Sequence, residues 1–461
     1  MSNRTSLESV STHFFTIVAQ NYLACAFVLG DSVLRYHPDA AFSIFLVDDT
    51  ERRWKAAIEA RGFTPIYPSE IPLVNYKQFV FQYNVTEAST GVKPFVFRAL
   101  FESSAERVIY LDPDMLCFRR FDEVLLALNH SSIVLTPHIC SPASDQHFPG
   151  EKAIMRSGVY NLGFIALRRG ATTSKFLNWW CDRLRLECIA EPDAGLFVDQ
   201  KWVDLVPGAF DHVYILRSLA YNIAYWNLHE RQLQQTARGL FEKNSGESVA
   251  LIHYSGFQLD DLNSICKYVA RNPLGDGLHQ QRYTLSSRPD MEPPFRLYQR
   301  LLLAAGAESF SQIPYAFAAY NDGAPISDLE RSLFRTSGKW RKQELDPFRI
   351  GKGSFREACR QAGVLASSPR KTNGPAPDSS PQTYSRYMRL IQFLLKLSLR
   401  ILGPQKYAQF SKYMRHQFLP SNHGFLLNPK ALTVNRPPAA KPQPVRSPIT
   451  GKTSEVQQDS A

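Results

Sequence analysis

The chain has 461 residues, of which 44% are hydrophobic, so it can bury a sizeable core and is expected to form two or three domains. Its net charge of +11 is unevenly distributed. From Val364 onward there are 14 Lys or Arg and 3 Asp or Glu. Subtracting these from the 53 basic and 42 acidic residues of the whole chain leaves 39 of each sign in residues 1–363. Because the main part of the chain is neutral, the overall basicity is no evidence for nucleic acid binding, and we expect no nucleic acid partner.

The seven cysteines are odd in number and include no C-x-x-C pair, which predicts free thiols in a reducing compartment. The apolar run from Phe14 is interrupted at Gln20 and Asn21, so we expect no signal peptide. The sequence also has no apolar span of the length that crosses a membrane. These features predict a cytoplasmic protein.

Short apolar runs alternate with segments of helical periodicity along the first half of the chain. The expected strands occupy residues 14–19, 42–47, 63–67, 107–111, 133–136, 159–167, 213–216 and 249–253. The expected helices occupy residues 22–36, 51–61, 86–103 (interrupted at Pro94), 174–188 and 193–205. This alternation predicts an α/β fold with a mostly parallel, Rossmann-like sheet flanked by helices.

The composition changes several times along the chain and predicts its division into segments. The expected segments are a disordered N-terminus (1–12), the α/β domain (13–258), a helical and loop-rich extension packed on it (259–363), a polar linker (364–384), basic amphipathic helices (385–419) and a disordered, basic, Pro-rich tail (420–461).

Two carboxylates, Asp112 and Asp114, directly follow the apolar run that ends at Leu111. Residues two apart in an extended chain point to the same side, and Pro113 stiffens the turn between them. Carboxylates that converge at the end of a buried strand repel each other unless a cation lies between them. Hard oxygen ligands favour Mn²⁺ or Mg²⁺, which also bind phosphate oxygens. A solvated turn is the alternative interpretation of this pair.

Four further motifs lie at the ends of predicted strands. Ala19, Asn21 and Tyr22 occupy a strand–helix junction of the kind at which nucleotides bind. Asn161 and Gly163 lie on a strand, where a glycine often marks close approach by another group. Asp199 and Gln200 adjoin, and His253 ends the last predicted strand, three residues before Gly256, which makes it a candidate third metal ligand. The alternatives are that Asp199 caps a helix or pairs with Lys201, and that His253 is a core or capping histidine.

In this order the five motifs resemble those of retaining glycosyltransferases of the glycogenin and bacterial lipopolysaccharide galactosyltransferase type, which have the GT-A fold. The resemblance spans roughly residues 13–258. It implies a catalytic domain that transfers a sugar from a nucleotide-diphosphate sugar, such as a UDP-sugar, to a glycan, lipid or protein acceptor.

The resemblance also implies roles for individual residues. Asp112, Asp114 and His253 would bind Mn²⁺, which holds the diphosphate. Asn161, Asp199 and Gln200 would surround the transferred sugar and the acceptor. The remaining positions expected near the nucleotide sugar are Ala19, Asn21, Tyr22, Asp48, Gly163 and Gly256, with either Lys93 or Arg98 as a nearby positive charge.

One departure from the family pattern concerns phosphate binding. The motif of the family continues as His-x-x-Gly-x-x-Lys, whereas Leu259 follows Gly256 at the corresponding spacing, and Lys267 is too far along to fill that position without rearrangement. Two other functions therefore remain open: a sugar-nucleotidyltransferase, and a non-catalytic module that binds a sugar or a membrane surface. The Ala19–Tyr22 junction lacks the Gly-rich, basic loop typical of the nucleotidyltransferases.

The segment 385–402 combines a broad apolar face with a stripe that carries Arg389, Lys396 and Arg400. This pattern is typical of a helix that lies in an anionic membrane interface. Peripheral contact with the inner face of the membrane through residues 385–419 is therefore one expectation. Packing of this helix on the catalytic body is the other.

Overall fold

The computed structural model describes residues 11–143, 149–261, 263–268, 283–365, 381–417 and 419–427. At its centre is a seven-stranded sheet in the order β10-β6-β7-β4-β1-β2-β3. Its strands are β1 (Thr12–Val18), β2 (Ala41–Leu46), β3 (Thr64–Ile66), β4 (Arg107–Leu111), β6 (Ile133–Pro137), β7 (Tyr160–Arg168) and β10 (Val213–Ile215). Neighbouring strands are parallel except where β7 runs antiparallel to both β4 and β6. The predicted α/β class with a mostly parallel sheet is confirmed.

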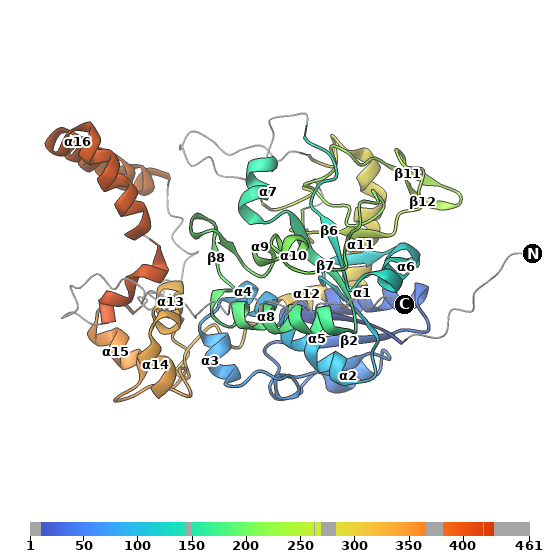
Figure 1. Ribbon diagram of the computed structural model, residues 1–461, viewed down its shortest axis with the longest axis horizontal. Helices are drawn as coiled ribbons and strands as arrows, with labels where there is room; N and C mark the ends of the chain where they lie inside the picture. The colour runs from blue at the N-terminus through green and yellow to red at the C-terminus, as the bar shows by residue number, and fades with distance from the viewer. Residues whose placement is uncertain are drawn as a thin grey trace, which may run out of the picture.

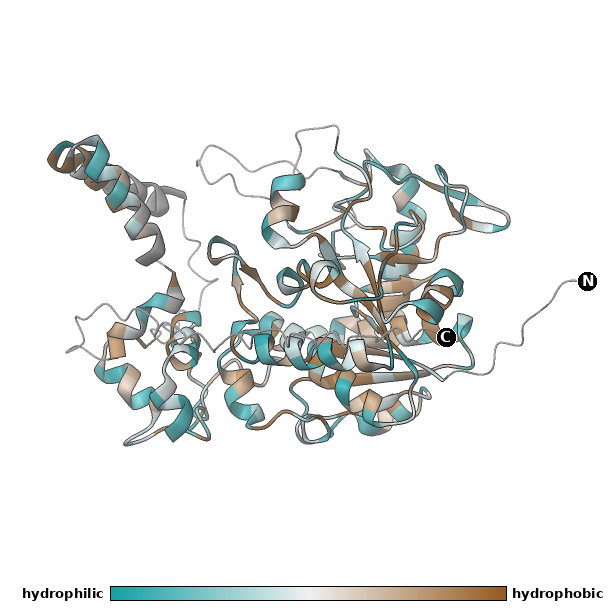
Figure 2. Ribbon diagram, in the orientation of Figure 1, coloured by the Kyte–Doolittle hydropathy of each residue, from teal (hydrophilic) through white to brown (hydrophobic). Residues whose placement is uncertain are grey.

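Successive residues of the central strands point to opposite faces of the sheet, and both faces are buried. Phe14 of β1 packs in one apolar cluster with residues of α1 (Leu23–Tyr36) and α6 (Asp122–His130). Phe15 packs in the other cluster with residues of α5 (Lys93–Glu102) and α8 (Ala171–Glu187). Figure 2 shows the hydrophobic strands enclosed between helices whose outer faces are hydrophilic.

The other helices of the α/β region are short. They are α2 (Lys55–Glu59), α3 (Tyr76–Phe81), α4 (Val85–Gly91), α7 (Glu151–Ser157), α9 (Gln200–Val203) and α10 (Val206–Ala209), and Figure 1 shows their arrangement. Pro94 lies in the first turn of α5, so the predicted helix 86–103 is divided into α4 and α5. Proline is tolerated there because the N–H groups of the first turn have no acceptor within the helix, so the N–H that proline lacks costs no intrahelical hydrogen bond.

Two predicted helices were wrong in extent. Residues 51–61 are helical only from Lys55 to Glu59, because Arg52 has a positive φ of 60° and the Asp49 carboxylate accepts from the backbone N–H of Arg53 and Trp54. Residues 193–205 are not one helix: Gly195 and Val198, with φ of 79° and 42°, separate a 3₁₀ turn, strand β9 (Leu196–Phe197) and α9. Strand β9 pairs with β8 (Ala190–Glu191).

The prediction that residues 249–253 form a strand of the main sheet was also wrong. Strand β13 (Leu251–His253) pairs antiparallel with β5 (Met115–Cys117) in a separate two-stranded ribbon. In this register His253 lies opposite Met115, directly after Asp114. A further hairpin, β11 (Leu233–Thr236) and β12 (Gly239–Glu242), was not predicted.

The C-terminal extension is helical and packs on the α/β domain. It contains α11 (Glu292–Ala304), α12 (Ala307–Ser311), α13 (Asp328–Thr336), α14 (Gly338–Gln343) and α15 (Phe355–Gln361). The buried guanidinium of Arg331 donates to the carbonyl oxygens of Phe81 and Tyr83 at 2.9 and 2.8 Å. These bonds fix α13 to the loop after α3.

Beyond the extension, α16 (Pro381–Gln417) projects from the body, at the upper left of Figure 1. Gly403, with φ of 71°, breaks it directly before Pro404, as predicted. Residues 420–427 were predicted to be disordered, but they form the 3₁₀ segment η5 (Pro420–Leu427), whose Leu426 and Leu427 pack against the main core.

Most of the predicted linker, N-terminus and tail lies outside the described residues. Within the described part of the chain, none of the helices has the length and hydropathy needed to cross a membrane. All seven cysteines are free thiols.

Candidate active site

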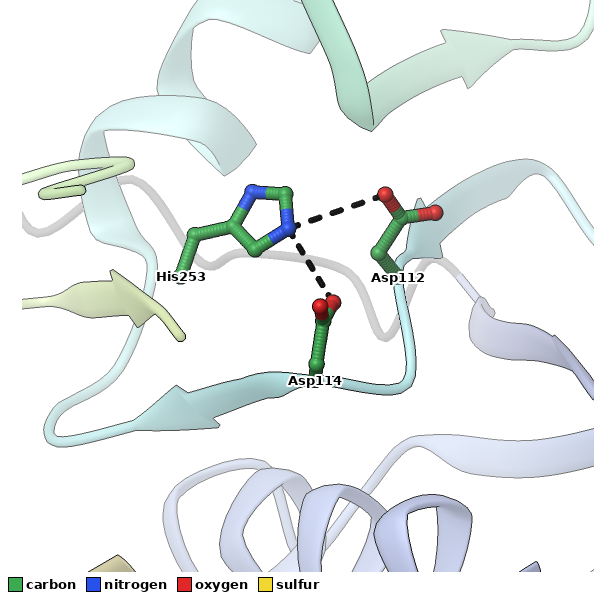
Figure 3. Close-up of side chains that lie close together, drawn as sticks. All are labelled: Asp112, Asp114 and His253. Carbon is green, nitrogen blue, oxygen red and sulfur yellow. Dashed lines mark ion pairs between the residues drawn. The ribbon is translucent and has the colours of Figure 1, made fainter. Parts of the chain in front are cut away.

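Asp112, Asp114 and His253 converge at the carboxyl end of β4 (Figure 3). The His253 Nε2 atom lies 3.0 Å from Oδ1 of Asp114 and 3.8 Å from Oδ2 of Asp112. One ligand atom from each residue lies within 4.8 Å of the other two. The prediction that these three residues gather at one point is therefore confirmed.

Three hydrogen bonds fix the two aspartates in place. The backbone N–H of Asp112 donates to the carbonyl oxygen of Gly163 at 2.7 Å, and the hydroxyl of Tyr110 donates to Oδ1 of Asp112 at 2.6 Å. The backbone N–H of Tyr254 donates to the carbonyl oxygen of Asp114 at 2.8 Å. Strands β4, β7 and β13 thus each hold one side of the turn.

Gly163 leaves the space that the His253 ring occupies. A Cβ atom at this position would lie 2.7 Å from Cε1 of His253 and 2.7 Å from Cε of Met115. Both distances are far below van der Waals contact. The glycine of the Asn-x-Gly motif is therefore required by the packing of His253.

The charges at this site interact strongly. Burial raises the pKa of the Asp112 carboxyl, and the repulsion of Asp114 adds to the rise, while the charges of Lys93 and His253 oppose it. Burial alone would lower the pKa of His253, but the carboxylates of Asp114 and Asp112 outweigh that effect and raise it.

These residues fit a divalent cation by their donor types. Two carboxylate oxygens and one imidazole nitrogen form a ligand set that Mn²⁺ accepts, and the spacing of the ligand atoms allows one ion to reach all three. A bound cation would also relieve the repulsion between the aspartates.

The three residues line a cavity of about 850 Å³. Its walls come from the ends of β4 and β7, the N-terminal part of α4 and α5, α7, and the segment that leads into α9. The lining residues singled out by the sequence are Lys93, Asp112, Asp114, Asn161, Gly163, Asp199, Gln200 and His253. The volume is sufficient for a small organic ligand.

Lys93 and Asp199 form an ion pair on the wall of this cavity. Nζ of Lys93 lies 2.5 Å from Oδ2 of Asp199 and donates to the carbonyl oxygen of Leu162 at 2.8 Å. Burial raises the pKa of the Asp199 carboxyl, and the ammonium of Lys93 opposes the rise. Lys201 bonds to Asp204 at 2.8 Å, so the alternative pairing of Asp199 with Lys201 was wrong.

Val198, directly before Asp199, has a φ of 42°. A β-branched residue is rarely found in this left-handed region, because its Cβ substituents crowd the backbone. Its backbone N–H donates to the carbonyl oxygen of Ile189 at 2.9 Å, which helps to hold this conformation. Such strain is concentrated at functional sites.

Asn161 and Gln200 are held by hydrogen bonds on the cavity wall. Nε2 of Gln200 donates to the carbonyl oxygen of Ser157 at 2.9 Å, which joins α9 to the end of α7. Oδ1 of Asn161 lies 3.2 Å from Nδ1 of His253.

Several other predicted residues do not line the cavity. Arg98 lies in a separate hollow between α5 and α8, so of the two candidate cations only Lys93 reaches the site. The carboxylate of Asp48 is occupied by the backbone N–H groups of Gln20 and Ala316 at 2.9 and 3.1 Å, and it joins the extension to the sheet. Ala19 and Asn21 are also absent from the lining.

Tyr22 and Gly256 do not line the cavity either. Burial and then the charge of Asp114 raise the pKa of the Tyr22 phenol. The carbonyl oxygen of Gly256 accepts from the backbone N–H of Lys267 at 2.8 Å. The backbone at Lys267 therefore lies beside the last residue of the His-x-x-Gly motif. The exposed Lys267 side chain lies 5.6 Å from the ring of Tyr268 and does not line the cavity.

The lining residues that the sequence analysis did not single out include His138, Tyr225 and Tyr268. His138 directly follows β6, whose carboxyl end lies at the same edge of the sheet as that of β4, so a strand-end histidine was a usable signal. The aromatic residues follow no regular strand pattern, and only the folded chain brings them to the site.

No protein-family model matches the chain. A curated relative, the uncharacterized protein YfnD of Bacillus subtilis (strain 168), is 23% identical over 258 residues, which are 54% of this chain and 78% of YfnD. It adds no information on activity.

Solved structures similar to this chain are described as glycosyltransferases, the kind of protein that the sequence motifs resemble. The galactosyltransferase LgtC, solved with donor and acceptor sugar analogs, is 16% identical with a TM-score of 0.35, and the match covers 66% of this chain and 97% of LgtC. The glycosyltransferase GlyE of Streptococcus pneumoniae TIGR4 is 12% identical with a TM-score of 0.35, covering 68% and 67%. Mouse xyloside xylosyltransferase 1 is 15% identical with a TM-score of 0.30, covering 53% and 97%. Scores this low carry no argument about activity, so the chemistry must be argued from the site.

Proposed function

We propose that the protein is a metal-dependent glycosyltransferase that moves a hexosyl group from a nucleotide-diphosphate sugar, such as a UDP-sugar, to a glycan, lipid or protein acceptor, with retention of anomeric configuration. The observation that carries the proposal is the convergence of Asp112, Asp114 and His253 on the wall of a cavity of about 850 Å³. Retention rests on the sequence resemblance.

The charges around the cavity support a role for a metal. The two cations in its described lining are already paired, Lys93 with Asp199 and Arg156 with Asp193. A diphosphate would therefore meet no unpaired protein cation among these residues. Mn²⁺ or Mg²⁺ on Asp112, Asp114 and His253 would supply the missing positive charge and act as a Lewis acid for the leaving diphosphate.

The remaining polar residues of the wall suit the sugar. The Asp199 carboxylate, held in place by Lys93, would stabilise positive charge that develops at the anomeric carbon. Gln200 and Asn161 would orient the sugar and acceptor hydroxyls, because both carry amide groups on the same wall. In this assignment Lys93 acts on Asp199 rather than directly on the donor.

Two other functions make different predictions. A sugar-nucleotidyltransferase would form a nucleotide sugar and release pyrophosphate from a nucleoside triphosphate and a sugar phosphate. A non-catalytic module would bind a nucleotide sugar or a surface without turnover. The buried ion pair beside the metal ligands and the strained Val198 favour a catalytic site over a binding module.

The test is a screen of nucleotide-diphosphate sugars with Mn²⁺, scored for hydrolysis and transfer by mass spectrometry. We expect turnover of one donor, its loss in excess EDTA, and an NMR coupling constant of the product that shows the anomeric configuration of the donor. Asp199→Ala and Gln200→Ala should lower kcat more than they weaken nucleotide binding. Full turnover in EDTA would remove the metal from the proposal, and an inverted product would remove retention.

We also propose that α16 contacts an anionic membrane surface and so brings the enzyme to a membrane-anchored acceptor on the cytoplasmic side. Phe393, Leu394 and Ile401 of this helix are 61%, 52% and 72% exposed, and Lys396 and Arg400 are exposed beside them. No acidic residue occurs between Asp378 and Glu455. A surface that is apolar and basic without acidic residues complements anionic lipid.

A further inference from the structure

His138 lies behind the metal-ligand cluster and takes part in a chain of hydrogen bonds that ends at His253. Its Nδ1 atom lies 3.2 Å from the carbonyl oxygen of Val159, and its Nε2 atom lies 3.3 Å from Nδ2 of Asn161. The side chain is buried and lines the cavity. No metal ligand is among its hydrogen-bond partners.

The direction of these hydrogen bonds follows from the chemistry of each group. The carbonyl oxygen of Val159 can only accept, so Nδ1 of His138 carries the proton. Burial lowers the pKa of His138 to about 4, so the ring is neutral at physiological pH and its Nε2 can only accept. The amide nitrogen of Asn161 must therefore face His138.

This orientation of the amide turns Oδ1 of Asn161 towards two donors. Nδ2 of Asn222 lies 3.2 Å from this oxygen, and Nδ1 of His253 also lies 3.2 Å from it. Since Oδ1 can only accept, Nδ1 of His253 carries a proton. Nε2 of His253 is then the atom that faces Asp112 and Asp114.

The packing around the two histidines restricts the same arrangement. The ring of Trp226 packs against both of them in edge-to-face contacts, with its centroid 5.2 Å from the ring of His138 and 5.2 Å from that of His253. Asn222, with a positive φ of 52°, also donates to Oγ1 of Thr136 at 3.1 Å. The chain of hydrogen bonds from His138 through Asn161 to His253, which we call the relay, is therefore supported on both sides by buried groups.

We propose that His138 is a positioning residue for metal binding: through Asn161 it fixes the tautomer of His253 that offers Nε2 to the metal. Without the acceptor at His138, the Asn161 amide can rotate and present its N–H groups to His253. That arrangement favours the opposite tautomer, in which Nε2 is protonated and cannot bind a metal. The inference rests on the metal site of the proposed function.

The experiment compares three variants of the full chain by calorimetric titration with Mn²⁺. His138→Leu removes the acceptor, and His138→Gln retains an acceptor at the position of Nε2. His37→Leu is the matched control, because His37 is also buried and neutral. His37 accepts from the backbone N–H of Phe121 at 3.2 Å, and Phe121 belongs to the apolar cluster that contains Phe14. Urea unfolding in EDTA checks that each variant folds.

We expect His138→Leu to weaken Mn²⁺ binding about 10-fold, the lower end of the effect of direct partners of metal ligands, because His138 acts one hydrogen bond further out through Asn161. His138→Gln should restore most of the affinity, and His37→Leu should bind as the wild type does. In ¹⁵N-histidine NMR of the metal-free protein, recorded above the pH at which the His253 signals stop titrating, His138→Leu should shift these signals towards the Nε2-protonated tautomer.

Equal Mn²⁺ affinity of folded His138→Leu and wild type would overturn the proposal, as would equal losses in His138→Leu and His138→Gln. Failure of the proposed function has a different signature. If the wild type binds no Mn²⁺, the metal site of the proposed function is wrong. If the wild type binds Mn²⁺ and His138→Leu weakens that binding, but no nucleotide sugar is turned over, the role of His138 holds and the glycosyltransferase assignment fails.

Discussion

Nζ of Lys93 lies 2.5 Å from Oδ2 of Asp199, and the two side chains are only 1% and 2% exposed. The same ammonium lies 4.1 Å from the ring centroid of Tyr110, whose hydroxyl bonds to Asp112. The ion pair thus connects the first turn of α5, the segment before α9 and the turn that carries Asp112 and Asp114. Ion pairs as buried as this one depend on both partners being present.

Lys93→Met should destabilise the fold by about 3–5 kcal/mol, because it leaves the Asp199 carboxylate buried without its partner. The free energy of unfolding from urea denaturation measures this. The double variant Lys93→Met/Asp199→Leu should be less destabilised, since it removes the unpaired charge. The exposed pair Lys55–Glu59 is the control, and Lys55→Met should cost less than about 1 kcal/mol. A Lys93→Met protein as stable as the double variant would contradict the expectation.

Asp112→Asn and Asp114→Asn should each lower kcat by about 100-fold or more and weaken Mn²⁺ binding, because each removes a charged ligand of the proposed metal. Steady-state kinetics and calorimetric titration with Mn²⁺ measure the two effects. Asp122→Asn, which removes a carboxylate from an exposed ion pair with Arg120, should leave both unchanged. Wild-type rates in both site variants would show that Asp112 and Asp114 belong to an ordinary turn without a catalytic role.

Gly163→Ala should weaken Mn²⁺ binding and destabilise the fold, because the new Cβ would displace the His253 ring or the Met115 side chain. Gly208→Ala is the matched control: it lies in α10, and nothing comes within 4 Å of the added Cβ. Thermal unfolding and Mn²⁺ titration compare the two. Similar behaviour of the two variants would show that the site accommodates the methyl group.

Stability should fall as the pH falls from about 6.5, in part through His37. Burial lowers its pKa from 6.5 to about 4, so between these values the unfolded chain binds a proton that the folded chain does not. The stabilisation is present above pH 6.5, and the resulting loss between pH 7 and pH 5 is about 2 kcal/mol.

Urea unfolding of wild type and His37→Gln at both pH values isolates this contribution. The variant should lose less stability than the wild type when the pH is lowered, whatever its stability at pH 7. Equal losses in the two proteins would mean that His37 does not titrate in this range.

Lys396→Glu/Arg400→Glu should weaken binding to anionic vesicles about 10-fold or more, since each basic residue near such a surface contributes about 1 kcal/mol. Co-sedimentation with vesicles of phosphatidylserine and phosphatidylcholine measures binding, and donor hydrolysis should be unchanged. Substitution is preferable to deletion of residues 384–461, because deletion would also remove Leu426 and Leu427 from the core. Arg238→Glu on the β11–β12 hairpin is the control, and equal binding by both variants would refute the contact.

The sequence by itself determined the α/β class and the position of the turn that carries Asp112 and Asp114. Both depend on local patterns: a buried strand is a short apolar run, and two carboxylates at its end share a side because side chains alternate along a strand. The strand Arg107–Leu111 has the same bounds in the structure as in the prediction. The helix break at Gly403 was equally local, because glycine adopts a positive φ without steric cost and proline lacks the N–H that a helix interior needs.

Only the tertiary structure decided which distant residues meet. Lys93 reached Asp199 and Arg98 did not, because α5 begins at Lys93 and this start sets which face of the helix points to the cavity. His253 reached Asp114 through pairing of β13 with β5, rather than through the main sheet. The positive φ of Val198 and the relay from His138 to His253 arise from packing between segments far apart in the chain, and no local pattern encodes such contacts.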